Sequence, residues 1–236
     1  MQGFNHTAAS LDDARTTGLA NFVRSIYILD VRTKNDSAVR EGPTFIEAAR
    51  KAQIIAAATE AIADVGFAHA SLARIARQAG ISKGVIGYYF PSKDDLVRAV
   101  VDSFYLTGHE QMMATLKDAQ SAGELLTRYI ATNLGFIAEN RAAARAITDI
   151  ITNFRKPDGE PHYRVEDTEP LIAGTAAMFA WGQETGEFRS FDTRVMAVTL
   201  RAAVDGFAGQ LATTPSLDVA AYTRELTELF QRAVRA

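Results

Sequence analysis

The 236-residue chain has no cysteine, only four histidines and a single tryptophan. Without cysteine it cannot form disulfides, thiolate zinc sites, iron–sulfur clusters or a cysteine nucleophile. The histidines are scattered, and no two of them are spaced four residues apart as metal ligands on one helix would be. We therefore expect no catalytic residues, no metal site and no cofactor, and the sequence does not predict an enzyme.

Long apolar runs are also missing. A membrane-spanning helix needs roughly 18 consecutive apolar residues, and the nearest candidate, residues 54–63, is interrupted by Glu60. The N-terminus lacks the basic start and the apolar stretch that are typical of a signal peptide. These features and the missing cysteines lead us to expect a cytoplasmic protein without a membrane partner.

Apolar residues instead recur at spacings of three and four, which is the period of an amphipathic helix. After the break at Gly42-Pro43, Thr44 is placed to cap a first helix that ends at Gly66. Eight further helices are expected over residues 72–79, 83–89, from 93 onward, 124–139, 141–154, 170–185, 192–211 and 217–234. Because strand-like alternation is almost absent, the chain is predicted to be all-α.

The second and third predicted helices are short and are separated by Gly80-Ile81, a pattern typical of a helix-turn-helix. Gly80 permits the sharp turn, and Ile81 anchors that turn in the core. Ser71 and Ser82 are placed to cap the two helices. The third helix would then present its first residues to the major groove of DNA.

The distribution of charge supports this interpretation. The overall net charge of −3 by itself argues against a nucleic-acid partner. Residues 71–93, however, contain four basic residues and no acidic residue, which is a net charge of +4. Residues 94–236 carry −6, so the acidity lies outside the helix-turn-helix. A local basic surface is sufficient for contact with phosphates.

Several short motifs follow one another at fixed spacings between residues 45 and 97. They are Ile54-Ile55, Ala57-Ala58, Gly66-Phe67, Ser71, Ile75-Ala76, Ala79-Gly80-Ile81-Ser82-Lys83-Gly84, Tyr88-Tyr89-Phe90 and Lys93-Asp94-Asp95-Leu96. In these residues the sequence resembles the TetR family of bacterial transcriptional regulators. The resemblance implies an N-terminal three-helix DNA-binding domain with a helix-turn-helix over residues 44–92. It also implies a C-terminal helical domain for effector binding and dimerisation over residues 93–236.

Residues 1–43 form an N-terminal extension with as many basic as acidic residues. Chain ends are often loosely ordered, so we interpret the extension as a disordered leader. The alternative is a short helix or strand over residues 19–31, which are apolar enough for either.

Carried over position by position, the resemblance implies a set of DNA-contacting residues. They are Ser71, Ser82, Lys83, Gly84, Val85, Gly87, Tyr88, Tyr89 and Lys93. Ser71, the two tyrosines and Lys93 would contact phosphates, whereas Val85 and Gly87 would face bases. Gly87 departs from the family, which usually has a side chain at that position. The alternative for either tyrosine is a place in the hydrophobic core.

The C-terminal helices offer candidates for an effector pocket, which needs apolar walls and a few polar groups. These candidates are Met112, Tyr129, Phe136, Phe154, Met178, Phe179 and Trp181. The alternative for each is ordinary core packing. The last two predicted helices carry small and apolar residues, and the resemblance implies that they form a homodimer interface. Packing within one subunit is the alternative there.

The main prediction is therefore a ligand-responsive, dimeric transcriptional regulator. We expect a repressor that binds a palindromic operator in double-stranded DNA and is released by a small molecule. A first alternative is a helical small-molecule-binding protein or enzyme that merely retains the DNA-binding head. A second alternative is a protein-interaction adaptor that no longer binds DNA. The presence of four residues argues against it: Ser82, Lys83, Tyr88 and Lys93.

Overall fold

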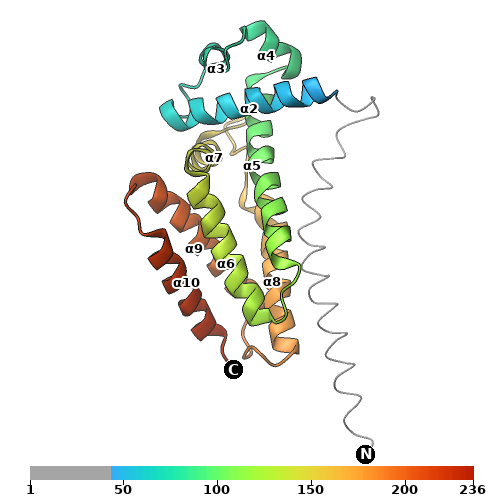
Figure 1. The fold of residues 1–236 in the computed structure, drawn as a ribbon, viewed down its shortest axis with the longest axis vertical. Coiled ribbons are helices and arrows are strands. Elements are labelled where there is room, and N and C mark those ends of the chain that lie inside the picture. The colour runs from blue at the N-terminus through green and yellow to red at the C-terminus, as the bar shows by residue number, and fades with distance from the viewer. Residues whose placement is uncertain (1–43) are drawn as a thin grey trace, which may run out of the picture. The chain divides into compact units, whose positions relative to one another are not determined.

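Helices form almost all of the regular structure. The computed structural model describes residues 44–236, apart from the side chains of residues 165 and 166. Over that range it contains nine α-helices, one short 3₁₀ helix and two isolated β-bridges (Figure 1). The helices are α2 (Phe45–Val65), α3 (Leu72–Gln78), α4 (Lys83–Tyr89), α5 (Lys93–Leu116), α6 (Ala122–Glu139), α7 (Arg141–Asn153), η1 (Val165–Thr168), α8 (Glu169–Glu184), α9 (Thr193–Thr213) and α10 (Val219–Val234). The predicted all-α class is confirmed, and the predictions for residues 1–43 lie outside the described residues.

Side-chain caps explain where the N-terminal helices begin. Thr44 and Glu47 form a capping box, in which each side chain accepts a hydrogen bond from the backbone N–H of the other residue, at 3.3 and 2.8 Å. Ser71 and Ser82 cap α3 and α4 by accepting the N–H of the residue three positions on, each at 3.3 Å. Ser92 does the same at the start of α5, at 3.0 Å. A cap of this kind contributes about 1 kcal/mol, so these polar residues fix the starts of the four helices.

Residue contacts divide the described chain into two compact units. We call residues 44–108 and 139–164 the head unit, and residues 109–138 and 165–236 the body unit. Helix α5 begins in the head unit and ends in the body unit, whereas α7 belongs wholly to the head unit. The sequence predicted a DNA-binding domain over residues 44–92 and an effector-binding domain over residues 93–236. The two units are defined by contacts and not by function, so these functional boundaries stay predictions.

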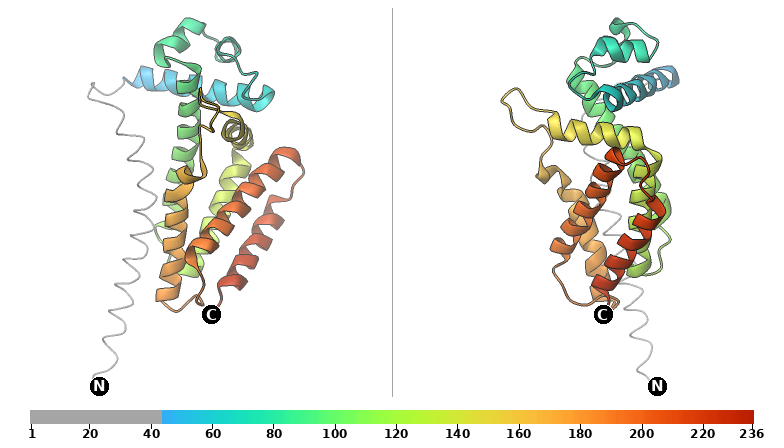
Figure 2. Two further views of the ribbon diagram at one scale, coloured as in Figure 1. Left: turned by 180° about the vertical axis from the view of Figure 1, so that it is seen from behind. Right: turned by 90° about the vertical axis from the view of Figure 1, so that its left-hand side faces the viewer.

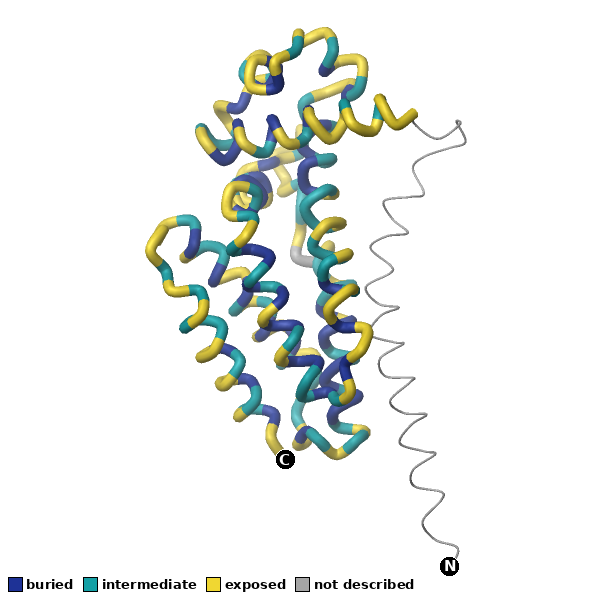
Figure 3. Tube along the Cα trace, in the orientation of Figure 1, coloured by how far each residue is buried: buried dark blue, intermediate teal, exposed yellow. Residues whose placement is uncertain are grey.

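Isoleucines from three helices are fully buried in the core of the head unit. Ile54 and Ile62 of α2, Ile75 of α3 and Ile86 of α4 are all fully buried. Burial of one such side chain contributes about 1.5–3 kcal/mol. Ile150 of α7 joins the same core. Figure 3 shows that burial along α2 is uneven, because the first turns of this helix are exposed.

The body unit contains the end of α5 together with α6, α8, α9 and α10. Its largest fully buried side chains are Trp181, Phe179 and Phe207. Helices α9 and α10 run side by side in the views of Figure 1 and Figure 2, and the rings of Phe207 and Tyr222 lie 4.9 Å apart between them. No helix within residues 44–236 is both long and apolar enough to cross a membrane.

One carboxylate and one amide side chain tie three segments of the body unit together. Glu187, in the connection between α8 and α9, accepts hydrogen bonds from the N–H groups of Ala122 and Gly123 at 3.1 and 3.0 Å. Gln231 of α10 donates from Nε2 to the Gly123 carbonyl at 2.7 Å. The first N–H groups of a helix have no partner within the helix. Glu187 therefore supplies acceptors that α6 needs and joins the start of α6 to the connection that follows α8, while Gln231 joins it to α10.

Candidate nucleic-acid interface

The connection between α3 and α4 has the conformation of a helix-turn-helix turn. Gly80 adopts a φ of +66°, a left-handed conformation that glycine tolerates best. The N–H of Ile81 donates to the Ala76 carbonyl at 3.0 Å, and the Ile81 side chain packs against the core of the head unit. Figure 1 shows α3 and α4 together on one side of α2. The expectations for Gly80 and Ile81 are therefore confirmed.

The structure brings the predicted DNA-contacting residues to the two short helices and the start of α5. Six of them are exposed: Ser71, Ser82, Lys83, Gly84, Gly87 and Tyr88. Three are half-buried: Val85, Tyr89 and Lys93. Tyr88 is 74% exposed and lies outside the core, whereas Tyr89 packs partly against it. Contact with DNA stays a prediction for all nine residues.

Lys93 makes two interactions within the head unit. Its Nζ donates a hydrogen bond to the Phe67 carbonyl at 2.8 Å and lies 4.6 Å from the centre of the Phe67 ring. Burial lowers the pKa of the Lys93 ammonium, and the nearby charge of Asp94 acts in the opposite direction. The ammonium is thus already oriented by the connection between α2 and α3.

Helix α7 holds the same peptide segment from another side. The Phe67 N–H donates to Asp149 Oδ2 at 2.5 Å. Gly66 makes this approach possible, because its φ is +81° and a Cβ there would lie 3.3 Å from Asp149 Oδ2. We call Asp149, Phe67 and Lys93 the Phe67 clamp. The clamp attaches α7 and the start of α5 to the connection from which the helix-turn-helix begins, and nothing in the local sequence pattern predicted it.

Phe154 is the one predicted ligand residue that lies in the head unit. Its ring is 5.4 Å from the Phe67 ring and is stacked on His162 at 4.2 Å. Tyr163 completes the aromatic cluster, with its ring 5.0 Å from that of His162. These contacts stabilise the head unit beside the Phe67 clamp. A role for Phe154 in ligand binding stays a prediction.

The other six predicted ligand residues are buried in the body unit. They are Met112, Tyr129, Phe136, Met178, Phe179 and Trp181. The Tyr129 hydroxyl accepts a hydrogen bond from Thr175 Oγ1 at 3.2 Å. The indole Nε1 of Trp181, by contrast, has no hydrogen-bond partner in the part of the chain that the structure describes. A buried donor without an acceptor costs about 1–3 kcal/mol, so the Trp181 N–H is a polar group that a bound molecule would stabilise.

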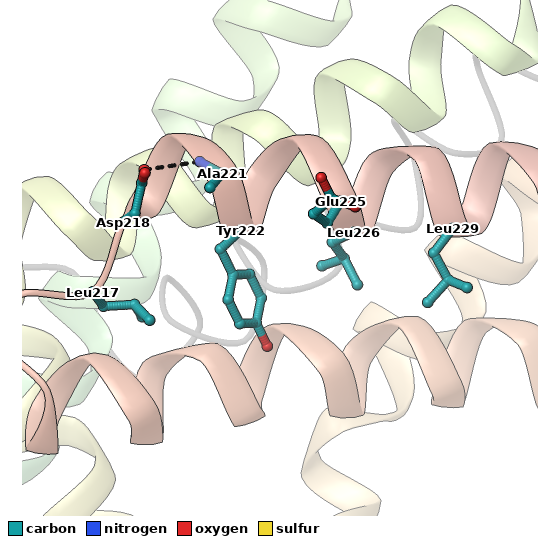
Figure 4. Close-up of a pocket in the computed structure, with 7 residues that line it drawn as sticks. All are labelled: Leu217, Asp218, Ala221, Tyr222, Glu225, Leu226 and Leu229. Carbon is teal, nitrogen blue, oxygen red and sulfur yellow. Dashed lines mark hydrogen bonds between the residues drawn. The ribbon is translucent and has the colours of Figure 1, made fainter.

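An apolar groove of about 450 Å³ runs along α10. It is lined by Leu217, Asp218, Ala221, Tyr222, Glu225, Leu226 and Leu229. Figure 4 shows the three leucines and Tyr222 pointing to the same side of the helix. Leu229 is 62% exposed, and α9 exposes two further apolar side chains, Val195 and Val198. None of the predicted ligand residues lines this groove, which has the character of an interaction surface rather than of an enclosed pocket.

The described side chains include no group of three His, Asp or Glu residues placed to hold a metal ion. Residues 80–84 do spell Gly-x-Ser-x-Gly, the sequence of a serine-hydrolase nucleophile turn. That turn joins a strand to a helix, whereas Ser82 here lies between two helices and its hydroxyl caps α4. These five residues therefore form the turn and the first residues of α4 in the helix-turn-helix, and not a nucleophile turn.

Comparison with known proteins gives a family match over the helix-turn-helix. A model of the bacterial regulatory proteins of the tetR family matches residues 54–100, which confirms the resemblance found in the motifs. The HTH-type transcriptional regulator BetI 2 of Chromohalobacter salexigens is 40% identical over 77 residues, 33% of this chain and 33% of that protein. The chain thus matches about a third of the length of this relative.

Solved structures match over more of the chain. A TetR-like transcriptional regulator from Rhodococcus sp. RHA1 is 25% identical with a TM-score of 0.66, and the match covers 79% of this chain and 96% of that one. The regulator FadR of Bacillus subtilis, solved in complex with stearoyl-CoA, is 22% identical with a TM-score of 0.63 and coverages of 78% and 99%. The likeness in fold therefore extends well beyond residues 54–100.

Proposed function

This chain belongs to the TetR family of bacterial regulatory proteins, and from that premise we propose that it is a transcriptional regulator that binds double-stranded DNA. The observation that carries the proposal is the basic, acid-free helix-turn-helix. Residues 71–93 have a net charge of +4, and Ser82, Lys83 and Tyr88 are exposed along α4. Phosphate contacts supply most of the affinity of such a surface, and the exposed first turn of α4 would read bases in the major groove.

Selection of duplexes from a random pool by the full-length protein tests this function. We expect one palindromic sequence to be enriched, because two-fold related heads read two half-sites. Fluorescence anisotropy should then give at least about 10³-fold tighter binding to the enriched duplex than to a scrambled one. A selection that enriches nothing, with equal affinity for both duplexes, would contradict the proposal.

Two lysines are expected to contribute to DNA binding in different ways. Lys93→Ala should weaken binding to every sequence and reduce the slope of log affinity against log salt by about 1, because one phosphate contact is lost. It should also lower the melting temperature, because the Phe67 carbonyl loses its donor. Lys83→Ala is the matched control: Lys83 is exposed, so stability should be unchanged while the preference among operator variants changes. Anisotropy titrations between about 50 and 200 mM salt measure the slope, and an unchanged slope and affinity in Lys93→Ala would exclude a phosphate contact.

We further propose that two copies of the chain associate through α9 and α10. A palindromic operator requires a two-fold arrangement of recognition helices. The exposed Val195 and Val198 of α9 and the apolar groove of α10 support this surface, because a second copy would remove their apolar area from water. The small residues of α9, such as Gly206 and Gly209, have open space around them and would allow close approach of helices.

Leu229→Glu is expected to shift the protein from dimer to monomer and to weaken operator binding, because a carboxylate would be buried in the apolar interface. Sedimentation velocity at micromolar concentration measures the change. Leu106→Glu, on an exposed position of α5, is the matched control and should remain dimeric. If Leu229→Glu sediments as wild type does, the subunits associate elsewhere.

We propose that a small molecule bound inside the body unit releases the DNA, so that the protein acts as a repressor in the cytoplasm. The apolar part of the effector would contact Met178 and Phe179, and a hydrogen-bond acceptor on it would pair with Trp181 Nε1, which has no acceptor among the described residues. The effector can weaken DNA binding only by preferring the conformation with lower DNA affinity. FadR with stearoyl-CoA is a precedent for a bound ligand on this fold.

The effector proposal can be tested through Trp181, which is the chain's only tryptophan. A panel of carboxylic acids, acyl-CoA thioesters and amides is screened for a change in tryptophan fluorescence and for a raised melting temperature. A true effector at 100 times its Kd should stabilise the protein by about 2.7 kcal/mol and should lower operator affinity. A compound that stabilises the protein without affecting operator binding would contradict the proposed coupling.

A further inference from the structure

The exposed face of α4 has side chains at its ends and none in its middle. Lys83, Gly84, Gly87 and Tyr88 are exposed, whereas Ile86 is fully buried. Positions three and four apart are neighbours on a helix surface, so Gly84 and Gly87 lie next to each other between the lysine and the tyrosine. We call these two residues the glycine gap.

Nothing within the described chain requires glycine at either position. A Cβ added at Gly87 would meet no heavy atom within 4 Å, and one at Gly84 would meet only Ser82 Oγ at an ordinary 3.7 Å. Among the described residues, positive-φ glycines are found at other positions, and both residues of the gap are helical. Glycine weakens a helix relative to alanine, and α4 is only seven residues long. A glycine that lowers the stability of its helix, and that the packing of the chain does not require, is typical of a functional site.

We infer that Gly87 is a specificity-determining residue, and that it allows the methyl group of a thymine in the operator to lie against bare backbone. This inference rests on the proposed DNA-binding function. The Gly87 N–H lies beyond the first turn of α4, where helix N–H groups bond within the helix. Its carbonyl, like every carbonyl of an α-helix, points along the helix axis toward the C-terminal end, so the surface that Gly87 presents outward is the apolar Cα. The thymine methyl is the apolar feature that base pairs present in the major groove. Without a Cβ, the axis of α4 can approach the base edges closely enough for that contact.

Gly87→Ala should therefore change stability and DNA binding in opposite directions. The melting temperature should rise by about 2–4 °C, because alanine favours the helix. Affinity for the selected operator should fall about tenfold, because the new methyl group occupies the space of the thymine methyl. Selection with the variant should then enrich a different base at one position of each half-site.

Gly135→Ala in α6 is the matched control. Gly135 is also helical, lies in the body unit and has no heavy atom within 4 Å of an added Cβ. Its replacement should raise the melting temperature to a similar extent and leave operator affinity unchanged. The control separates the effect of the substitution on helix stability from its effect on the interface.

The deciding experiment changes the DNA instead of the protein, by removing the methyl group of one thymine at a time. Wild type is titrated against the selected operator and against duplexes in which deoxyuridine replaces one thymidine at a time. We expect one substitution per half-site to weaken wild-type binding severalfold and to leave Gly87→Ala unaffected. Equal binding of wild type to all these duplexes, or full operator affinity in Gly87→Ala, would overturn the inference. If no operator is enriched in the first place, it is the proposed function that fails.

Discussion

Replacing Asp149 with alanine is expected to lower the free energy of unfolding by about 2 kcal/mol, with a fall of about 4–8 °C in the melting temperature. The Phe67 N–H would lose the carboxylate oxygen that accepts its hydrogen bond at 2.5 Å. Hydrogen bonds to a charged group are about twice as strong as neutral ones. The loss would also weaken the attachment of α7 to the connection between α2 and α3, although the rings of Phe67 and Phe154 would stay in contact, so the helix-turn-helix would sample more orientations within the head unit. Operator affinity should therefore fall about tenfold, which corresponds to about 1.4 kcal/mol.

Two further variants separate a positioning role of Asp149 from a general loss of structure. Asp149→Asn keeps an oxygen that can accept from Phe67, so it should recover part of the stability and most of the operator affinity. Glu160→Ala removes an exposed carboxylate of the same unit, whose ion pair with Arg164 has a separation of 3.3 Å. Exposed pairs of this kind contribute at most about 1 kcal/mol, so this control should behave as wild type. Urea unfolding and anisotropy titrations give the two quantities, and a destabilised Asp149→Ala with unchanged operator affinity would show that α7 does not position the helix-turn-helix.

The features that the sequence predicted well are those encoded within a few residues. Ser71 and Ser82 cap α3 and α4 by accepting the N–H of the residue three positions on, and the breaks at Gly66 and Gly80 coincide with left-handed backbone. Cap residues and glycine turns act locally, so one sequence is enough to detect them. The order and type of the nine described α-helices followed from the same signals.

The features that the sequence could not predict depend on contacts between distant segments. Asp149 and Phe67 are 82 positions apart, and no periodicity relates them. Phe154 was recognisable as a buried residue, but apolar spacing alone does not indicate that it would enter the core of the head unit. The missing partner of Trp181 Nε1 is likewise a result of packing. The place of Trp181 on a predicted C-terminal helix made it a candidate for the pocket lining, without indicating why its N–H matters.

Gly182→Ala is expected to destabilise the body unit although alanine favours helices. A Cβ at Gly182 would lie 2.6 Å from Cγ of Phe188 and would overlap two further atoms of that ring. Phe188 is buried, and its backbone N–H donates to the Gly182 carbonyl at 2.9 Å, so the residue is fixed at both backbone and side chain. Overpacking of this kind costs about 1–3 kcal/mol. We expect a net loss of about 2 kcal/mol in the free energy of unfolding and a melting temperature lower by about 4–8 °C.

The cause of that loss can be isolated with the Phe188 ring itself. If steric overlap is responsible, Gly182→Ala should destabilise wild type strongly but should have little effect, or a small favourable one, in a Phe188→Ala background. A double-mutant cycle measured by urea unfolding would then give a coupling of about 1–3 kcal/mol between the two positions. Gly135→Ala, where an added Cβ meets open space, should stabilise the chain by the helix preference alone. A Gly182→Ala protein as stable as Gly135→Ala would mean that the segment around Phe188 can move aside, and the packing between α8 and its following connection would then be looser than the contacts indicate.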